Sequence, residues 1–112
     1  MYARFLQMKT KFGQARTLCT AAQRDILPIL NKFAGFVDVM WTIPDDSPDE
    51  VLAVSWWESS EAADRFNAEG YGEVEKIYRR YVEGEIRVRK CEVTVEPTGK
   101  AQETRARTAR MI

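Results

Sequence analysis

The fold is decided by Gly35-Phe-Val-Asp-Val-Met-Trp-Thr-Ile43, the polar segment Pro44-Asp-Asp-Ser-Pro-Asp49 and the run Val51-Leu-Ala-Val-Ser-Trp-Trp-Glu-Ser-Ser60. The first and last segments are rich in β-branched and aromatic residues, which favour strands. The middle segment has two prolines and three aspartates, which favour a turn. Together they predict a β-hairpin whose strands carry large apolar side chains on both faces.

The chain before this hairpin predicts one strand and one helix. Residues 2–9 have the length and aromatic content of a strand. Between residues 14 and 30, apolar residues recur every three or four positions, which predicts a helix with one apolar side. Pro28 predicts a kink or a restart in this helix, because proline lacks a backbone N–H and clashes with the preceding turn. Ala34-Gly35 ends the helical region.

The chain after the hairpin predicts a helix in two pieces and a final strand. The helix begins with a serine cap at Ser59 or Ser60. A second helical piece spans 73–82, and alternating apolar residues predict a strand over 85–96. The predicted breaks between and after these elements are Gly70, the hinge Tyr71-Gly72, Gly84 and Pro97.

The resulting order of elements, βαββαβ, indicates an α+β domain of ferredoxin-like type. In this fold the helices cover one face of a four-stranded antiparallel sheet. We expect the domain to span residues 1–96. Residues 97–112 form a polar, basic C-terminal tail, with four basic residues against one acidic residue and a net charge of +3.

The overall charge is balanced, with 17 basic and 17 acidic residues. A protein that binds nucleic acid needs a surplus of positive charge, so we expect no nucleic-acid partner. No apolar run is long enough for a signal peptide or a membrane span, and Cys19 and Cys91 belong to no CxxC motif. We therefore expect a cytoplasmic protein with free thiols and no membrane partner.

Both faces of the predicted sheet carry large apolar side chains. Strand 36–43 places Phe36, Asp38, Met40 and Thr42 on one face and Val37, Val39, Trp41 and Ile43 on the other. Strand 50–58 places Val51, Ala53, Ser55 and Trp57 on one face and Leu52, Val54, Trp56 and Glu58 on the other. The helices can cover only one face, and monomers rarely expose an apolar patch of this size. We therefore expect a homodimer that packs sheet to sheet, because buried apolar area contributes about 25 cal/mol per Å².

Three short motifs in the hairpin and the following helix match a known family. They are Ala34-Gly35-Phe36, Val54-Ser-Trp-Trp-Glu-Ser59, and Glu61-Ala62-Ala63 with Phe66. With these motifs the chain resembles the antibiotic biosynthesis monooxygenase (ABM) family and the wider superfamily of dimeric α/β barrels. The resemblance covers about residues 2–95 and implies the dimeric barrel fold. The same frame hosts cofactor-free oxygenases, haem-degrading enzymes and isomerases, so it does not imply one activity.

The haem-degrading branch of the family ligates iron with a histidine and has a second tryptophan in its pocket. The corresponding positions, counted from Trp57, hold Glu75 and Phe66, and the chain contains no histidine. We therefore expect no haem and no other cofactor. We also expect no metal, because the carboxylates and the two cysteines lack the spacing of a metal site.

The branch that oxidises polyketide anthrones uses Trp, Asn, Tyr and Arg side chains, for which the nearest candidates are Trp57, Asn67, Tyr71 and Arg87. We predict Arg87 and Tyr71 as the catalytic residues. Arg87, or Arg4 in its place, would stabilise a phenolate or enolate anion, and Tyr71 would orient a substrate oxygen. The predicted substrate-binding residues are Trp57, Asn67, Phe66 and Tyr78.

Each of these residues also has a purely structural interpretation. The tryptophans fit the core and the dimer face equally well, because aromatic side chains bury large areas with or without a ligand. The tyrosines and Asn67 fit the edge of the core. The arginines would form ion pairs with Asp38 or Glu85, or ion pairs across the dimer interface.

The resemblance implies a cofactor-independent monooxygenase that acts on a small electron-rich aromatic, such as a quinol or an anthrone. Such a substrate itself donates an electron to O₂, and the protein supplies desolvation and orientation. The alternative is a non-catalytic dimeric barrel that binds a hydrophobic small molecule or acts as an assembly module. The absence of a strong acid–base residue favours this alternative. A third hypothesis is a subunit of a larger complex that docks through its basic tail.

Overall fold

The computed structural model describes residues 1–96, and the predicted tail of residues 97–112 lies outside them. The elements in chain order are β1 (Tyr2–Thr10), α1 (Ala15–Ala21), the π-helical turn η1 (Ala22–Ile26), α2 (Leu27–Leu30), β2 (Phe36–Thr42), β3 (Glu50–Trp57), α3 (Ser60–Glu69), α4 (Tyr71–Tyr78) and β4 (Val82–Glu92). The strands form one antiparallel four-stranded sheet in the order β2-β3-β1-β4. The predicted ferredoxin-like βαββαβ fold is confirmed.

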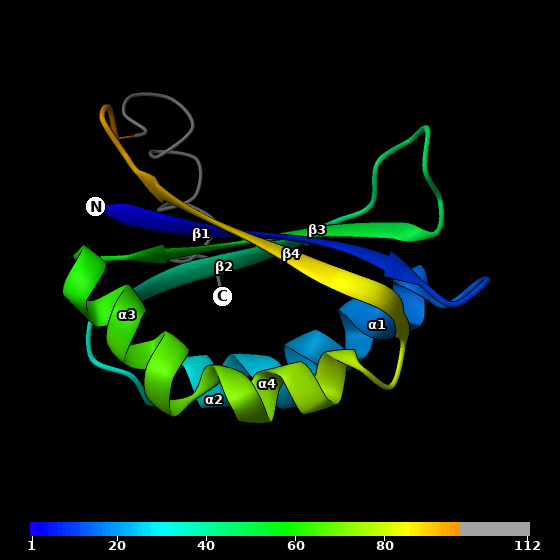
Figure 1. Ribbon diagram of the computed structural model, residues 1–112, viewed down its shortest axis with the longest axis horizontal. Helices are drawn as coiled ribbons and strands as arrows, with labels where there is room; N and C mark the ends of the chain where they lie inside the picture. Colours follow the sequence, from blue (N-terminus) through cyan, green and yellow to red (C-terminus); the bar gives the residue numbers. More distant parts are fainter. Residues whose placement is uncertain (97–112) are drawn as a thin grey trace, which may run out of the picture.

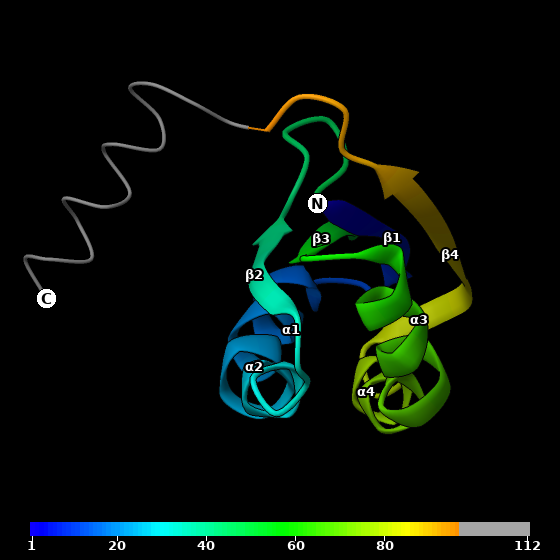
Figure 2. The same cartoon turned by 90° about the vertical axis from the view of Figure 1, so that its left-hand side faces the viewer.

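The helices all lie on one face of the sheet (Figure 1). Seen from the end, α1 and α2 form one column beneath β2, and α3 and α4 form a second column beneath β4 (Figure 2). The core lies between the sheet and the helices. Its most deeply buried side chains include Met8, Val51 and Trp57 of the sheet and Leu18, Ile26, Phe66 and Val74 of the helices.

The first helical region is interrupted, as Pro28 predicts, but the interruption extends one turn further back. α1 runs directly into η1, and a regular helix restarts with α2 at Leu27, which has Pro28 in its first turn. Proline is tolerated there because the first turn leaves backbone N–H groups without intrahelical partners. Ile26, at the end of η1, is 1% exposed and is one of the core residues.

The second helical region differs from the prediction at the junction of its two pieces. The break falls at Gly70, and Tyr71-Gly72 is the first turn of α4 rather than a hinge. α4 ends at Tyr78 instead of residue 82. The last turn closes there because the backbone N–H of Tyr81 donates to the carbonyl of Tyr78 across 2.9 Å.

The last strand is displaced towards the N-terminus relative to the predicted range of 85–96. β4 begins at Val82, which pairs with Thr10 of β1. Gly84 therefore lies inside the strand and does not end the helix. Its φ of +72° accompanies a register shift in the β1–β4 ladder, a bulge that favours glycine. The local pattern of β4 does not show this pairing, because the partner strand lies at the other end of the chain.

A register shift at the start of β2 changes one predicted face. Phe36 lies opposite Trp57, whereas Asp38 lies opposite Trp56. Phe36 therefore packs on the helix-covered face, with its ring centroid 5.4 Å from that of Trp57. Simple alternation predicts Phe36 and Asp38 on the same face. This prediction is wrong, because the β2–β3 register shifts between these two residues.

The face of the sheet away from the helices, here called the open face, carries an apolar patch on β1, β2 and β3, beside polar residues such as Gln7 and Arg87. Phe5, Met40 and Leu52 are 46%, 47% and 38% exposed. Phe5 and Met40 flank the buried Val54 in one cross-strand row, and Trp56 lies half-buried on the same face. The prediction of apolar side chains on both faces of the sheet therefore holds.

Gly35 of the Ala34-Gly35-Phe36 motif occupies a position that only glycine fits. Its φ is +87°, and an added Cβ would lie 2.5 Å from Cβ of Ala62 in α3. We expect Gly35→Ala to lower the free energy of unfolding by about 2–5 kcal/mol. A left-handed backbone costs about 1–2 kcal/mol and overpacking about 1–3 kcal/mol. Urea denaturation of the purified variant measures the loss.

Gly13→Ala is the matched control for this substitution. Gly13 has a similar φ of +72°, but no heavy atom lies within 4 Å of an added Cβ. Its loss should be confined to the backbone strain of about 1–2 kcal/mol. Equal losses in the two variants would contradict the role of the contact between Gly35 and Ala62.

Candidate functional site

A small cavity lies between the sheet and the two helix columns. Its volume is about 20 Å³, on the order of the space that one water molecule needs. Its walls come from both layers of the fold. They are Arg4 and Leu6 of β1, Ile26 of η1, Leu30 of α2, Val39 of β2, Ala53 and Ser55 of β3, Phe66 of α3, and Tyr71, Val74 and Tyr78 of α4.

Arg4 is the one charged side chain buried within residues 1–96, and it is 2% exposed. β1 turns it towards the helices because Arg4 alternates in phase with the buried Leu6. Its Nη2 donates a hydrogen bond to Oδ1 of Asn67 across 2.9 Å. Its Cζ lies 4.8 Å from the ring centroid of Tyr71 and 5.2 Å from that of Phe66. These cation–π contacts stabilise the buried positive charge.

No carboxylate in the described part of the chain lies within ion-pair distance of Arg4. Arg24 and Arg79, by comparison, pair with Asp25 and Glu75. Burial lowers the pKa of the Arg4 guanidinium, but an arginine keeps its charge in proteins because its ordinary pKa is so high. Among residues 1–96, the positive charge of this site is therefore not neutralised by an ion pair.

Two buried polar atoms, Nε of Arg4 and Oη of Tyr71, have no hydrogen-bond partner in the part of the chain that the structure describes. Both residues line the cavity. Buried polar groups are nearly always hydrogen-bonded, and an unpaired one costs about 1–3 kcal/mol. Both groups can donate, so each suits a ligand atom with lone pairs.

The two tyrosines of the cavity stay protonated at neutral pH. Burial raises the pKa of Tyr71, and Glu75 raises it further, while Arg4 opposes the shift. Burial also raises the pKa of Tyr78 far above its ordinary value, although a hydrogen bond from Trp41 opposes this. Nε1 of Trp41 donates to Oη of Tyr78 across 2.8 Å. The protonated Tyr71 hydroxyl can therefore donate a hydrogen bond.

The aromatic wall of the cavity is supported from behind by Trp57, which is fully buried. The Trp57 ring stacks on Phe66 with centroids 5.0 Å apart and an interplanar angle of 24°. Its Nε1 donates to Oγ of Ser55 across 2.9 Å. Trp57 thus holds two lining residues in place, but it does not line the cavity itself.

The structure brings most of the predicted site residues together around Arg4. Phe66, Tyr71 and Tyr78 line the cavity, and Asn67 reaches it through its hydrogen bond to Arg4. The sequence contains a signal for Arg4, because this charged residue falls in phase with apolar Leu6 on a short strand. A charge at such a position marks either an ion pair or a polar site.

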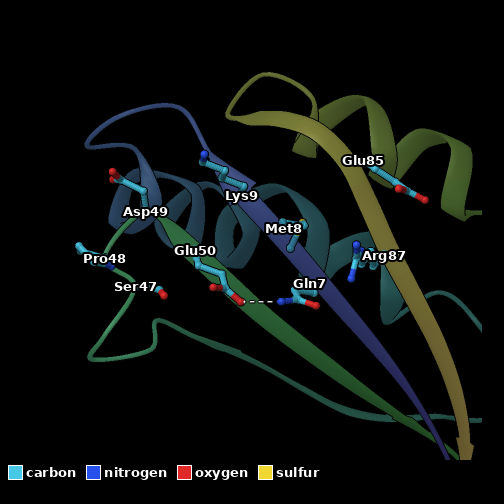
Figure 3. A pocket seen from close by; sticks show the side chains of 9 residues that line it. All are labelled: Gln7, Met8, Lys9, Ser47, Pro48, Asp49, Glu50, Glu85 and Arg87. Carbon is cyan, nitrogen blue, oxygen red and sulfur yellow. Dashed lines mark hydrogen bonds between the residues drawn. The ribbon is translucent and has the colours of Figure 1, made fainter.

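Arg87 lies on the open face of the sheet, away from this cavity. Its side chain is exposed. Glu50 accepts a hydrogen bond of 3.0 Å from the side chain of Gln7, and Gln7 lies opposite Arg87 in the β1–β4 ladder. Both line a pocket of about 390 Å³ beside the β2–β3 loop (Figure 3). The other lining residues are Met8, Lys9, Ser47, Pro48, Asp49 and Glu85. Successive residues of a strand point to opposite faces, and Arg87 points to the open face. The cavity with Tyr71 lies on the helix-covered face, so the structure does not bring the two residues together.

Within residues 1–96, no three side chains of His, Cys, Asp or Glu type are grouped so that they could hold a metal ion. Cys19 and Cys91 are free thiols, as expected from the sequence. Among the helices of this part of the chain, none is long and apolar enough to cross a bilayer.

Comparison with known families adds to this geometry. The model of the antibiotic biosynthesis monooxygenase family matches residues 1–71, which include Arg4, Trp57, Phe66, Asn67 and Tyr71. The chain belongs to the antibiotic biosynthesis monooxygenase family. No curated protein matches the chain significantly by sequence.

Several solved structures share this ABM fold. A monooxygenase of Streptomyces coelicolor in complex with the ligand nanaomycin D is 14% identical, with a TM-score of 0.68 over 87% of this chain and 92% of that chain. SnoaB, a cofactor-independent oxygenase from Streptomyces nogalater, is 16% identical, with a TM-score of 0.67 over 85% and 95%. A protein of unknown function from Nitrosomonas europaea is also 16% identical, with a TM-score of 0.68 over 88% and 95%. At these identities the likeness establishes the fold and leaves the substrate open.

Proposed function

We propose that this ABM protein is a cofactor-independent monooxygenase that acts on a small electron-rich aromatic of quinol or anthrone type. The observation that supports it most strongly is the buried Arg4 guanidinium, which lines an aromatic cavity and whose Nε has no acceptor among residues 1–96. In a site with little water, such a charge stabilises a phenolate or enolate oxygen. A structural relative, SnoaB, is itself a cofactor-independent oxygenase, which supports the same chemistry.

The proposed chemistry needs no external reductant, because the substrate supplies the electrons. An anthrone-type methylene group reacts with O₂ to give a carbonyl group and water, so one oxygen atom enters the product and the other leaves as water. The enolate form of the substrate transfers electrons to O₂. Arg4 holds the enolate oxygen, Tyr71 donates a second hydrogen bond, and the rings of Phe66 and Tyr71 exclude water.

The lining of the cavity restricts the substrate further. None of the described residues that line it is a carboxylate or a histidine. Both tyrosines stay protonated, so the lining offers no strong base. The substrate must therefore lose its proton readily near neutral pH, and the charge of Arg4 lowers the pKa of the bound group.

The size of the cavity favours a second candidate function. Ligand pockets typically have roughly 300–1,000 Å³, whereas this cavity has about 20 Å³. A bicyclic aromatic enters only when a helix column moves away from the sheet. The second candidate is therefore a non-catalytic dimeric barrel that binds a smaller molecule without oxidising it.

Oxygen uptake distinguishes the two candidates. We expect the full-length protein to consume O₂ with at least one member of a panel of naphthoquinols and anthrones, in the presence of a metal chelator. Mass spectrometry with labelled O₂ should find one labelled oxygen atom in the product. Binding of a panel member without O₂ uptake would instead support the non-catalytic barrel.

We also propose that the protein forms a homodimer through the open face. Phe5, Met40 and Leu52 lie on three adjacent strands of that face and are all at least one-third exposed. A stable monomer rarely leaves such a patch in water. A second copy of the chain offers a matching apolar surface, because a twofold interface pairs the same patch on both subunits.

A charge placed in this patch should break the dimer. We expect Met40→Glu to raise the dimer dissociation constant at least about 100-fold, because the residue opposite Met40 is Val54 and burying an unpaired carboxylate costs several kcal/mol. Sedimentation velocity at micromolar concentration measures the effect. Phe12→Glu is the control, because Phe12 is 91% exposed and lies beyond the end of β1. A monomeric wild-type protein, or equal effects of both variants, would contradict the proposed interface.

A further inference from the structure

Arg4 and Tyr71 line the cavity, and each has a buried hydrogen-bond donor without an acceptor among residues 1–96. Nε of Arg4 and Oη of Tyr71 are both buried and unpaired, while Nη2 of Arg4 is already bound to Asn67. A phenol can also accept a hydrogen bond, but Nε of an arginine only donates. An occupant of this space must therefore offer lone pairs to Arg4.

The charge around this space is positive. The nearest polar oxygen on the guanidinium belongs to the neutral amide of Asn67. Asp64 acts on Arg4 only from a distance and is exposed, and its carboxylate lies 3.4 Å from Nζ of Lys90. A buried charge without a counter-charge is costly, so an anion at this point stabilises the folded protein more than a neutral molecule does.

The space also limits the size of the occupant. A volume of about 20 Å³ accepts a single atom or a very small group, comparable to one water molecule. Its remaining walls are apolar or aromatic and include Ile26, Leu30 and Val74. A large or divalent oxyanion would need several more donors than these walls provide.

We infer that Arg4 and Tyr71 form a binding site for a small monovalent inorganic anion, such as chloride or bromide, in the protein without substrate. Anion binding at this site does not depend on the proposed oxygenase activity, because the anion would bind whether or not the protein oxygenates an aromatic. A water molecule is the competing occupant, since it also fits the space. A bound anion makes the stability of the protein depend on the identity of the salt beyond the general salt effect, and this part of the dependence needs Arg4.

Thermal unfolding of the full-length protein tests this inference. Sodium chloride or sodium bromide is titrated against sodium gluconate at constant ionic strength, because gluconate carries the same charge but is too large for the cavity. We expect the midpoint of unfolding to rise by about 5 °C when the chloride concentration reaches roughly ten times its dissociation constant. The rise should be lost in Arg4→Gln and reduced in Tyr71→Phe, which removes a single hydroxyl group.

Arg87→Gln serves as the control, because it removes a positive charge from the open face and should keep the full chloride effect. Diffraction from a crystal soaked in bromide should place the anomalous peak between Nε of Arg4 and Oη of Tyr71. A wild-type midpoint that does not depend on the anion would overturn the inference. The same holds if Tyr71→Phe and Arg4→Gln retain the wild-type response, since the anion would then bind elsewhere. Loss of oxygenation activity would not affect either readout.

Discussion

Replacement of Arg4 by glutamine should lower the turnover number for the best quinol or anthrone substrate by about 100–1,000-fold, the usual effect of removing one donor to a developing oxyanion. Glutamine retains a hydrogen-bonding amide but removes the buried charge. Arg4 is 2% exposed and its guanidinium lies against two aromatic rings, so water cannot replace it. Oxygen uptake under saturating substrate measures the loss.

Two further variants make this prediction specific. Arg4→Lys keeps a positive charge but lacks the planar Nε–H, so it should recover only part of the activity. Arg87→Gln removes an exposed arginine on the other face of the sheet and should leave turnover unchanged. Normal turnover in Arg4→Gln together with impaired turnover in Arg87→Gln would contradict the cavity as the active site. It would support Arg87, which the sequence predicts as a catalytic residue.

Replacement of Trp57 by alanine should lower the free energy of unfolding by about 3–5 kcal/mol, the range found for large aromatic residues in cores. The side chain is fully buried, stacks on Phe66 and contacts Phe36 edge-on. Since domains of this size are stable by only about 5–15 kcal/mol, the variant should lose a large share of its stability. Urea denaturation, followed by far-ultraviolet circular dichroism, measures the change.

Trp56→Ala provides the comparison, because Trp56 is the next residue in the chain but lies on the open face. We expect it to weaken the dimer more than it destabilises the subunit. Sedimentation and denaturation at a fixed protein concentration separate the two effects. If Trp56→Ala and Trp57→Ala destabilise the subunit equally, the division of the tryptophans between core and dimer face is wrong.

Much of the fold could be predicted from local patterns. Alternation over 36–43 and 50–58, the turn-forming prolines between them and the serine cap after them all depend on near neighbours in the chain. The errors fall where distant segments decide the structure. β4 starts at Val82 because it pairs with Thr10, and Phe36 changes faces because the β2–β3 ladder slips. Neither pairing partner is visible in the local sequence.

The candidate site was predicted in part for the same reason. Tyr71 and Tyr78 are seven residues apart in one helix, which is two turns, so their common orientation towards the sheet follows from the sequence. Phe66 belongs to the separate helix α3, so its place beside them does not follow from the sequence. The choice between Arg4 and Arg87 does not, because each alternates with other residues on its own strand. It depends on which face of the sheet the helices cover, and that face is the one with Leu6 and Ala53.

The order of residues was therefore enough to establish the βαββαβ fold, the two apolar faces and the resemblance to the ABM family, because these follow from periodicity and short motifs. It also showed that no histidine is present. Packing in three dimensions was needed to bury Arg4 without an acid beside it and to set Tyr71 against its guanidinium. Arg4 of β1 and Tyr71 of α4 lie 67 residues apart in the chain, and the charge of a site depends on which residues meet there.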